Sequence, residues 1–221
     1  MHISKNKTSI KIFCFNFFQE NTYVIWNNQT KNCWIIDPGC MSDSEEKKLF
    51  DFIEEMQLKP IRLINTHCHL DHVYGNKAVA DKYQLELGIH QEEEKILQAA
   101  GMSAKIFGVP VPAKLEPSYF LKEDEFLNLD DVPFKVLFTP GHSPGSVSFY
   151  NEEDKYCIVG DVLFHRSIGR TDLPYGDYDT LIKSIQEQLY TLAEETEIYN
   201  GHGLHTSIAQ EKRYNPFVRV S

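Results

Sequence analysis

The stretch Thr66-His67-Cys68-His69-Leu70-Asp71-His72 places three imidazoles and one carboxylate within six residues. Directly before it, residues 61–65 are β-rich and follow Pro60, which predicts a short buried strand. Four polar side chains at the end of a strand cannot all enter a core, because buried polar groups need partners. A metal site would satisfy all four, so the pattern H-x-H-x-D-H favours metal ligation over a polar loop with incidental histidines.

The spacing within this motif suggests two ions rather than one. His67 and His69 are two residues apart, so on an extended backbone both side chains project to the same side and suit one ion. Asp71 and His72 come after the chain turns, within reach of a second ion. Imidazole suits zinc and iron, and a carboxylate suits harder cations. By the same alternation Cys68 points to the opposite face, which favours core packing over ligation.

Length and composition are those of an ordinary globular protein. The 221 residues allow one large domain or two small ones, with 42% hydrophobic and 24% charged residues. We see no apolar run near the roughly 20 residues that span a bilayer, and residues 1–11 are too polar for a signal peptide. Five scattered cysteines form no C-x-x-C pair, which favours reduced thiols and a cytoplasmic location.

The net charge of the chain limits the classes of partner that we expect. The net charge is −10 and no block of Lys and Arg is present, whereas a protein that grips nucleic acid needs a basic surface. We therefore expect a small-molecule substrate, and neither a nucleic acid nor a membrane as partner. The composition leaves open whether the chain forms a homo-oligomer.

Hydrophobic patterning predicts strands in both halves of the chain and helices between them. Strands are expected at residues 10–15, 21–26, 33–36, 61–65, 85–89, 125–129, 134–138, 146–150, 156–159 and 197–199. Helices are expected at residues 42–57 (with a Ser42–Glu45 capping box), 75–83, 91–100, 178–192 and 207–214. Residues 101–118, rich in Gly and Pro, are expected to form a surface loop and a candidate wall of the active site. Two β-rich halves with helices outside predict an α/β sandwich.

Three more strand ends carry residue types that bind metals. His142 lies in the turn Gly141-His142-Ser143-Pro144-Gly145, Asp161 follows Gly160, and His202 lies between Gly201 and Gly203. Glycines at these turns permit close backbone approach and unusual φ angles. Each residue alone has an ordinary structural explanation, but together with the first motif they indicate one composite site.

These motifs resemble those of the metallo-β-lactamase-fold hydrolases, and within them the compact bacterial glyoxalase II-like proteins. The resemblance covers nearly the whole chain. It rests on the H-x-H-x-D-H run together with Asp37-Pro38-Gly39, Gly141-His142-Ser143-Pro144-Gly145-Ser146, Gly160-Asp161-Val162-Leu163-Phe164, Gly169-Arg170-Thr171-Asp172, Gly201-His202-Gly203 and Asn215-Pro216-Phe217.

The resemblance implies a single domain over residues 1–221, folded as an αββα four-layer sandwich with two divalent metal ions at one edge. Zinc is the expected metal, and iron or manganese is also compatible. The implied ligands are His67, His69 and His142 for the first ion, Asp71, His72 and His202 for the second, and Asp161 between the two. Seven ligands for two ions leave positions open for water and substrate, which is the mark of a catalytic site.

The implied activity is that of a metallohydrolase, a hydroxyacylglutathione hydrolase-like thioesterase. A metal-bridging hydroxide would attack a small acyl thioester such as S-lactoylglutathione, and Asp71 would also orient that hydroxide or shuttle its proton as a catalytic residue. Arg170 stands where glyoxalase II places a basic residue near the substrate carboxylate, which implies substrate binding. The alternative for Arg170 is an ion pair with Asp172 or Asp177 that pins the loop.

Three departures from relatives qualify this picture. The best-known class of zinc β-lactamases carries Cys at the position of Asp161, which argues against antibiotic hydrolysis. The chain stops soon after Pro216, where glyoxalase II continues into a helical extension that grips glutathione. This weakens the case for glutathione as the carrier and leaves thioester chemistry intact. Leu204 stands where many relatives have Pro.

Three rival functions fit parts of the same pattern. An iron-dependent persulfide dioxygenase shares the fold and much of the H-x-H-x-D-H motif, although its pattern near His202 usually differs from Gly-His-Gly. A lactonase or other ester hydrolase would use the same centre. A non-catalytic metal-binding module is disfavoured, because structural zinc sites are closed and usually rich in cysteine.

Overall fold

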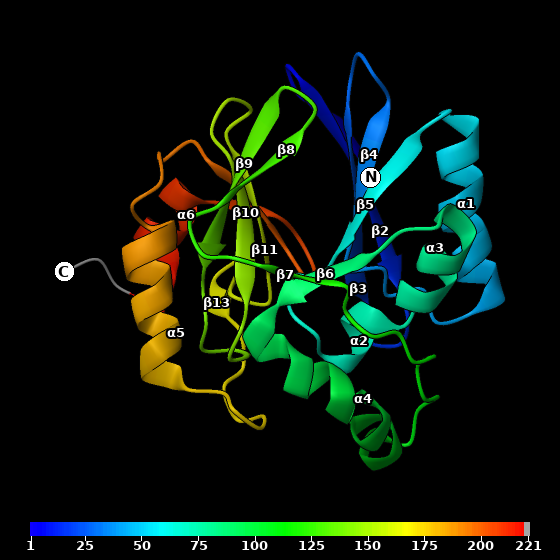
Figure 1. Ribbon diagram of the computed structural model, residues 1–221. Helices are drawn as coiled ribbons and strands as arrows, with labels where there is room; N and C mark the ends of the chain where they lie inside the picture. Colours follow the sequence, from blue (N-terminus) through cyan, green and yellow to red (C-terminus); the bar gives the residue numbers. More distant parts are fainter. Residues whose placement is uncertain (219–221) are drawn as a thin grey trace.

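Two β-sheets packed face to face form the centre of the molecule (Figure 1). The computed structural model describes residues 1–218. The first sheet has the strand order β1-β2-β3-β4-β5-β6-β7, in which β4 to β7 run parallel. Its strands are β1 (His2–Ser4), β2 (Thr8–Phe15), β3 (Glu20–Asn27), β4 (Asn32–Ile36), β5 (Lys59–Ile64), β6 (Leu87–His90) and β7 (Tyr119–Leu121).

The second sheet is built from the other half of the chain. Its strand order is β15-β14-β11-β10-β9-β8, in which the pair β11–β14 is parallel and the other pairs are antiparallel. Its strands are β8 (Phe126–Leu129), β9 (Val132–Phe138), β10 (Val147–Asn151), β11 (Tyr156–Gly160), β14 (Glu197–Asn200) and β15 (Thr206–Ser207). A short hairpin of β12 (Leu163–Phe164) and β13 (Ser167–Ile168) follows β11.

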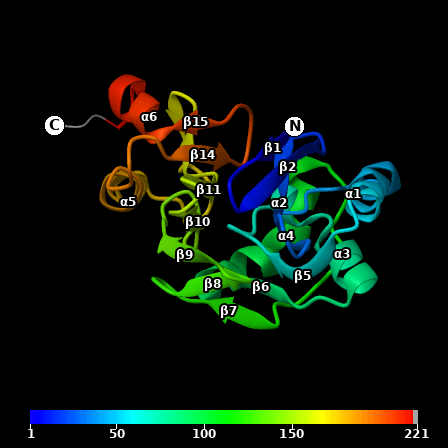
Figure 2. The same ribbon diagram turned by 90° about the horizontal axis from the view of Figure 1, so that it is seen from above.

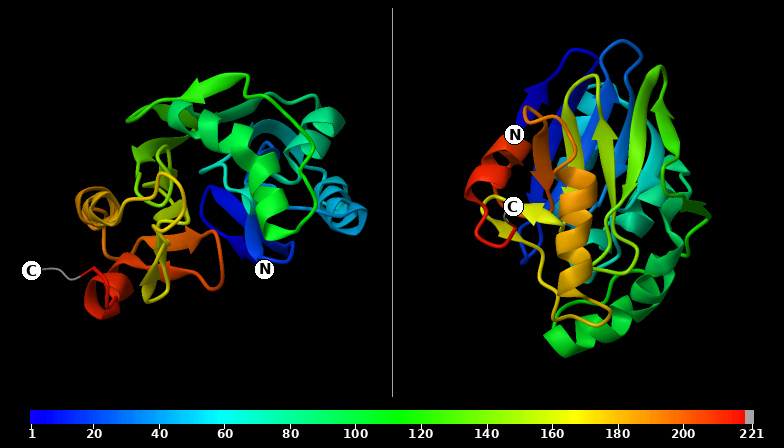
Figure 3. Two further views of the ribbon diagram at one scale, coloured as in Figure 1. Left: turned by 90° about the horizontal axis from the view of Figure 1, so that it is seen from below. Right: turned by 90° about the vertical axis from the view of Figure 1, so that its left-hand side faces the viewer.

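Helices cover the outer faces of both sheets (Figures 2 and 3). On the side of the first sheet lie α1 (Asp43–Glu55), α2 (Leu70–Val73), α3 (Asn76–Tyr83), the 3₁₀ turn η1 (Gln91–Glu93) and α4 (Glu94–Phe107). On the side of the second sheet lie α5 (Tyr178–Ser184), its π-helical continuation η2 (Ile185–Leu189) and α6 (Ile208–Tyr214). No helix among residues 1–218 is long and apolar enough to cross a membrane.

Alternation of side chains along the strands creates the layers. In β3, Tyr23 and Ile25 belong to the hydrophobic cluster between the two sheets, whereas Val24 and Trp26 belong to the cluster beneath the helices of the first sheet. In β11, Ile158 faces the inner cluster and Val159 packs with α5 and α6. Three stacked hydrophobic clusters separate four layers, which confirms the predicted αββα sandwich.

The expected loop at residues 101–118 is wrong in its first part. Residues 101–107 form the second half of α4, which ends at Gly108 in the left-handed conformation (φ +68°). The helix continues through Gly101 because Ala100 and Ala104 stand four residues apart on one buried face. Packing of this face outweighs the low helix propensity of one glycine. Strands β1 and β7 were not expected from the pattern, because each has only three residues.

Candidate metal centre

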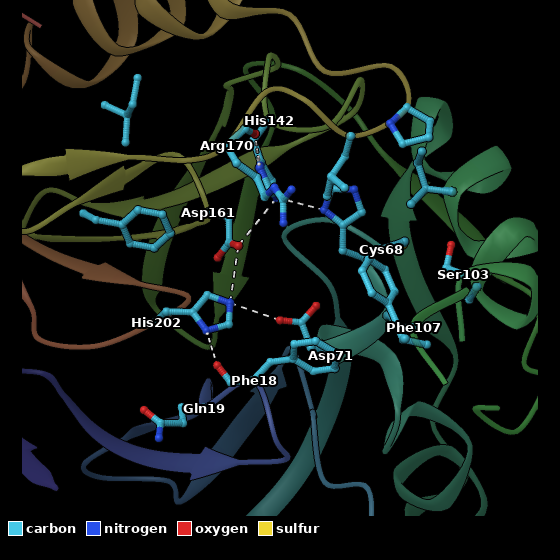
Figure 4. A pocket seen from close by; sticks show the side chains of 18 of the residues that line it. Phe18, Gln19, Cys68, Asp71, Ser103, Phe107, His142, Asp161, Arg170 and His202 are labelled. Carbon is cyan, nitrogen blue, oxygen red and sulfur yellow. Dashed lines mark hydrogen bonds and ion pairs between the residues drawn. The ribbon is translucent and has the colours of Figure 1, made fainter. Parts of the chain in front are cut away.

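The seven predicted ligands lie in the segments that follow four strands at one edge of the two sheets. Strands β9, β11 and β14 run in the same direction, so the loops that carry His142, Asp161 and His202 leave the second sheet at one edge. The loop after β5 reaches this edge from the first sheet, where the Thr66 carbonyl accepts a hydrogen bond from Val147 N at 2.9 Å. The structure therefore brings all seven predicted ligands together. Figure 4 shows four of them, Asp71, His142, Asp161 and His202.

The first group of side chains contains His67, His69 and His142. Their nitrogen atoms lie within 4.8 Å of one another, and His69 Nδ1 lies 2.8 Å from His142 Nε2. His142 Nδ1 lies 2.7 Å from the Arg170 carbonyl oxygen, and because a carbonyl can only accept, this nitrogen carries the proton. The Nε2 lone pair of His142 therefore points into the group, free to bind a cation.

The second group contains Asp71, His72 and His202, and Asp161 stands between the two groups. His202 Nε2 lies 3.0 Å from Asp71 Oδ2 and 3.4 Å from Asp161 Oδ2, and His72 Nε2 lies 3.5 Å from Asp161 Oδ1. The same Oδ2 of Asp161 is 3.5 Å from His142 Nε2 in the first group. Asp161 thus has oxygen atoms close to both groups, as a bridging ligand requires.

One hydrogen bond and one nearby carboxylate outside the centre position the histidines of the second group. His202 Nδ1 donates to the Phe18 carbonyl at 3.0 Å, which leaves Nε2 unprotonated when the ring is neutral. His72 Nδ1 lies 3.1 Å from Asp37 Oδ2, and Asp37 is itself held by the N–H and hydroxyl of Thr66 at 2.7 and 2.6 Å. A carboxylate or carbonyl behind a histidine fixes its tautomer and ring orientation, which is typical of metal sites.

Buried polar atoms in the centre fit a metal site. Within residues 1–218, His67 Nε2, His72 Nε2 and Asp161 Oδ1 are buried and find no hydrogen-bond partner. Each unsatisfied buried polar group costs about 1–3 kcal/mol, and a cation bound between these three atoms would remove that cost. Neutral imidazoles and carboxylates are the donors that zinc and iron accept, so the residues fit the divalent ions that the sequence implies.

The two groups differ in how firmly they hold protons. Burial and the neighbouring histidines lower the pKa of His67 well below its usual range, and burial first of all lowers the pKa of His69 to about 3. Although burial opposes it, the hydrogen-bonded carboxylates of Asp161 and Asp71 raise the pKa of His202 to about 10. Although burial opposes it here too, Asp71 and Asp161 also raise the pKa of His72 well above its usual range. In the metal-free protein at neutral pH, the first group is therefore neutral, whereas His72 and His202 of the second group are both protonated.

This difference predicts a pH dependence for the second ion alone. An ion that binds His72 and His202 must displace a proton from each, so its affinity should rise more than tenfold, and up to about a hundredfold, per pH unit between pH 6 and 8. The histidines of the first group have lowered pKa values, so the first ion should change little above pH 7. Competition titrations with a chromogenic chelator at several pH values would resolve both steps, and equal slopes for the two ions would contradict the assignment.

Glycines make room for the bridging carboxylate. An added Cβ at Gly201 would collide with Asp161 Oδ1, and one at Gly160, where φ is +52°, would collide with the Thr66 hydroxyl. Both positions lie directly at strand ends that supply candidate ligands. Glycine at these two positions therefore allows the backbone to pass close to the candidate ligands, as the sequence analysis expected.

Glu93 is a functional residue that the sequence analysis missed. Its buried carboxylate accepts hydrogen bonds from Cys68 N at 2.7 Å, Ser143 Oγ at 2.6 Å and Gly145 N at 2.7 Å. One side chain thus ties the loop of His67 and His69 to the loop of His142. The sequence shows Glu93 only between Glu92 and Glu94, a run that indicates a solvated helix start, so no local signal distinguishes it.

Asn16 clamps a second loop in a similar way. Its side-chain amide donates to the carbonyl oxygens of Gly39 and Asp71, both at 2.9 Å. Its φ of +52° is a conformation that asparagine tolerates better than most residues. The β2–β3 turn therefore positions the backbone of one candidate ligand, Asp71, while its Phe18 carbonyl holds another, His202.

The surroundings of Cys68 and Arg170 bear on the alternatives that the sequence analysis weighed for each of them. Cys68 is fully buried in the hydrophobic cluster beneath the helices, and burial raises the pKa of its thiol well above the usual range. Arg170 lines the pocket in front of the centre and forms a two-point ion pair with Asp172, at 2.7 and 2.8 Å. Asp177 does not take part, because its carboxylate caps α5 through Thr180 N.

A pocket of about 800 Å³ opens directly onto the centre. His69, Asp71, His142, Asp161 and His202 line it. Phe18 and Phe107 line it as well, beside Asp71 (Figure 4). This volume is in the range that holds a small organic ligand. Candidate metal ligands that open into such a pocket can meet a substrate, unlike those of a closed structural site.

Comparison with known proteins agrees with this geometry. The profile of the Metallo-beta-lactamase superfamily matches residues 15–202. The chain is 42% identical to hydroxyacylglutathione hydrolase GloC of Haemophilus influenzae over 212 residues, which cover 95% of this chain and 98% of the relative.

Two solved structures are also similar over almost their full length. One is BLEG-1, described as a B3 metallo-β-lactamase (TM-score 0.87, 36% identity, 95% of this chain and 99% of that chain). The other is TTHA1623 in a di-iron-bound form (TM-score 0.84, 32% identity, 94% of this chain and 100% of that chain). Fold, site geometry and these similarities together place the chain in the metallo-β-lactamase superfamily, to which it therefore belongs.

Proposed function

We propose that the protein is a binuclear metal-dependent hydrolase of acyl thioesters. The observation that carries the proposal is the pair of ligand groups around Asp161, which contain unpaired buried polar atoms and open through five of the seven residues onto a pocket of substrate size. The similarity to a relative named hydroxyacylglutathione hydrolase supports thioesters, S-lactoylglutathione among them, as the substrate class. The proposed ligands are His67, His69 and His142 for one ion, Asp71, His72 and His202 for the other, and Asp161 for both.

Divalent ions bound here would lower the pKa of a shared water and polarise the substrate carbonyl. Hydrolysis forms one C–O bond, breaks the C–S bond and releases a carboxylate, a thiol and a proton. Asp71 is the proposed catalytic carboxylate for that proton. Although burial opposes it, His72 and His202 hold the pKa of Asp71 below its usual range, so its carboxylate is ionised and able to accept a hydrogen bond from the attacking water. The thiol leaves without a strong general acid, because its pKa is about 8.5.

Zinc is the proposed native metal, and the ligand set also accepts iron or manganese. A similar protein was solved in a di-iron-bound form, so iron is tested beside zinc. The decisive assay follows thiol release from S-lactoylglutathione and from a neutral thioester before chelation, after chelation, and after each metal is restored. Thioester turnover that disappears with the metal supports the proposal, and its absence under every metal rejects it.

β-Lactam hydrolysis is a second candidate, because one similar structure is described as a B3 metallo-β-lactamase. The absence of Cys at position 161 separates this chain only from the best-known class of zinc β-lactamases, so the argument against antibiotic hydrolysis does not extend to that neighbour. A chromogenic cephalosporin assayed beside the thioesters decides between the two. A kcat/KM for the cephalosporin above that for every thioester would favour the second candidate.

Arg170 is proposed to bind an anionic group of the substrate's thiol carrier. Replacement by Ala should raise KM for S-lactoylglutathione about two- to fivefold and leave kcat within twofold, since the guanidinium is exposed and its ion pairs are weak. Asp172→Asn is the matched control, because it frees the guanidinium and should lower KM instead. An equal rise of KM for a neutral carrier would show that Arg170 only holds the loop.

A further inference from the structure

One side of the pocket is apolar in a way that metal binding does not require. We use the name apolar wall for the residues Phe18, Ile96, Ala100, Ile106 and Phe107. Along α4, the pocket-lining positions 96, 100, 103 and 107 are spaced by three or four residues, so one face of the helix turns toward the pocket. Ile96 and Ala100 lie in the predicted helix 91–100, whereas Ser103, Ile106 and Phe107 lie in the part of α4 that the sequence pattern assigned to a loop.

The apolar wall is continuous with the candidate metal centre. The rings of Phe18 and Phe107 meet edge to face with their centroids 6.2 Å apart, and the Phe18 carbonyl accepts the hydrogen bond from His202 Nδ1. Ile96 and Ala100 form the buried end of the wall, whereas the Ile106 and Phe107 side chains are 75% and 51% exposed at its outer end. Apolar side chains gathered around the mouth of a pocket indicate an apolar binding partner.

The remaining lining adds little charge. Four further lining residues outside the wall are also apolar: Phe164, Ile168, Leu173 and Pro174. Among the described lining residues, Arg170 is the one Lys or Arg, and it forms an ion pair with Asp172. Away from the metal centre, the pocket therefore suits an uncharged apolar group that lies next to the reacting carbonyl.

We propose that the apolar wall binds the acyl group of the thioester, as an apolar chain of about four to eight carbons. The inference rests on the proposed thioesterase function and goes beyond it, because it ranks such chains ahead of short hydroxyacyl groups such as lactoyl. The acyl group is assigned to the wall, and the carrier to the rim near Arg170, for two reasons. The wall begins at the metal ligands, and a polar thiol carrier must depart into water after cleavage.

The test compares acyl groups on one small neutral carrier, N-acetylcysteamine. The wild-type enzyme, loaded with metal, should show kcat/KM rising about two- to fourfold for each methylene from acetyl to hexanoyl, with butanoyl ahead of lactoyl. A flat series, or lactoyl ahead of butanoyl, overturns the inference while leaving the thioesterase function intact. No turnover of any thioester rejects the proposed function and this inference with it.

Two substitutions on α4 locate the effect. Ser103→Trp places a large ring between Ala100 and Phe107 and should lower the ratio of hexanoyl to acetyl kcat/KM at least tenfold. Met102→Trp adds the same ring one position away, on a side chain that is 63% exposed and does not line the pocket, and should leave that ratio unchanged. Equal ratios for both variants and the wild type would show that the chain binds elsewhere.

Discussion

Replacement of Asp161 by Ala is expected to lower thioester hydrolysis by roughly a thousandfold or more and to leave at most one ion per chain. Asp161 is the side chain with oxygen atoms near both ligand groups, at 3.5 Å from His72 Nε2 and 3.5 Å from His142 Nε2. Its loss therefore removes a ligand from each ion at once. Steady-state assays and elemental analysis of the purified variant measure both effects.

Asp154→Ala is the matched control for this prediction. Asp154 is as buried as Asp161, but it accepts hydrogen bonds from the backbone N–H groups of Lys7 and Thr8, at the other end of the molecule's sheets. Its replacement should lower thermal stability and leave two ions bound. Full activity in Asp161→Ala, or equal metal loss in both variants, would contradict the bridging role.

Replacement of Glu93 by Ala is expected to destabilise the fold by about 3–5 kcal/mol and to weaken binding of the first ion roughly 10- to 100-fold. The carboxylate accepts three hydrogen bonds, and its removal leaves Cys68 N, Ser143 Oγ and Gly145 N buried without it. The two loops that hold the first group would then no longer be tied together. Urea unfolding of the metal-free protein and a metal titration separate the two effects.

Glu92→Gln is the control, because Glu92 is the exposed neighbour of Glu93 and pairs only with Lys95 on the surface. This change should leave both the stability and the metal affinity close to those of the wild type, because exposed ion pairs contribute little. Glu93→Gln should also weaken the site, since its amide would point a donor at one of the three donors. If a Glu93 variant had lowered stability but normal metal affinity, the role of Glu93 would be purely structural.

The fold was largely predictable because its signals are local. Side chains along the strands alternate between two apolar faces. Helix α1 begins at the Ser42–Glu45 capping box, which was predicted from the sequence. The second half of α4 was missed because Gly and Pro in residues 101–118 suggest a loop, and only the packing of Ala104 against the core reveals the helix. At such positions the packing of buried side chains outweighs the low helix propensity of the local sequence.

The candidate site was predictable where ligand types cluster in the sequence or stand at glycine-flanked strand ends. His67 and His69 project to one side of the chain as their spacing indicates, and His142, Asp161 and His202 join them through the ends of β9, β11 and β14. The supporting residues were not predictable. Glu93 and Asn16 act through contacts across 23 to 55 positions in the chain, which no short pattern records.

The most direct test of the account is the metal content of the purified protein, measured together with hydrolysis of S-lactoylglutathione and of a neutral thioester. The account predicts about two divalent ions per chain and thioester turnover that is lost on chelation and regained with metal. A single iron per chain, no hydrolysis, and oxygen uptake with a glutathione persulfide would contradict it and would assign the same fold to a persulfide dioxygenase.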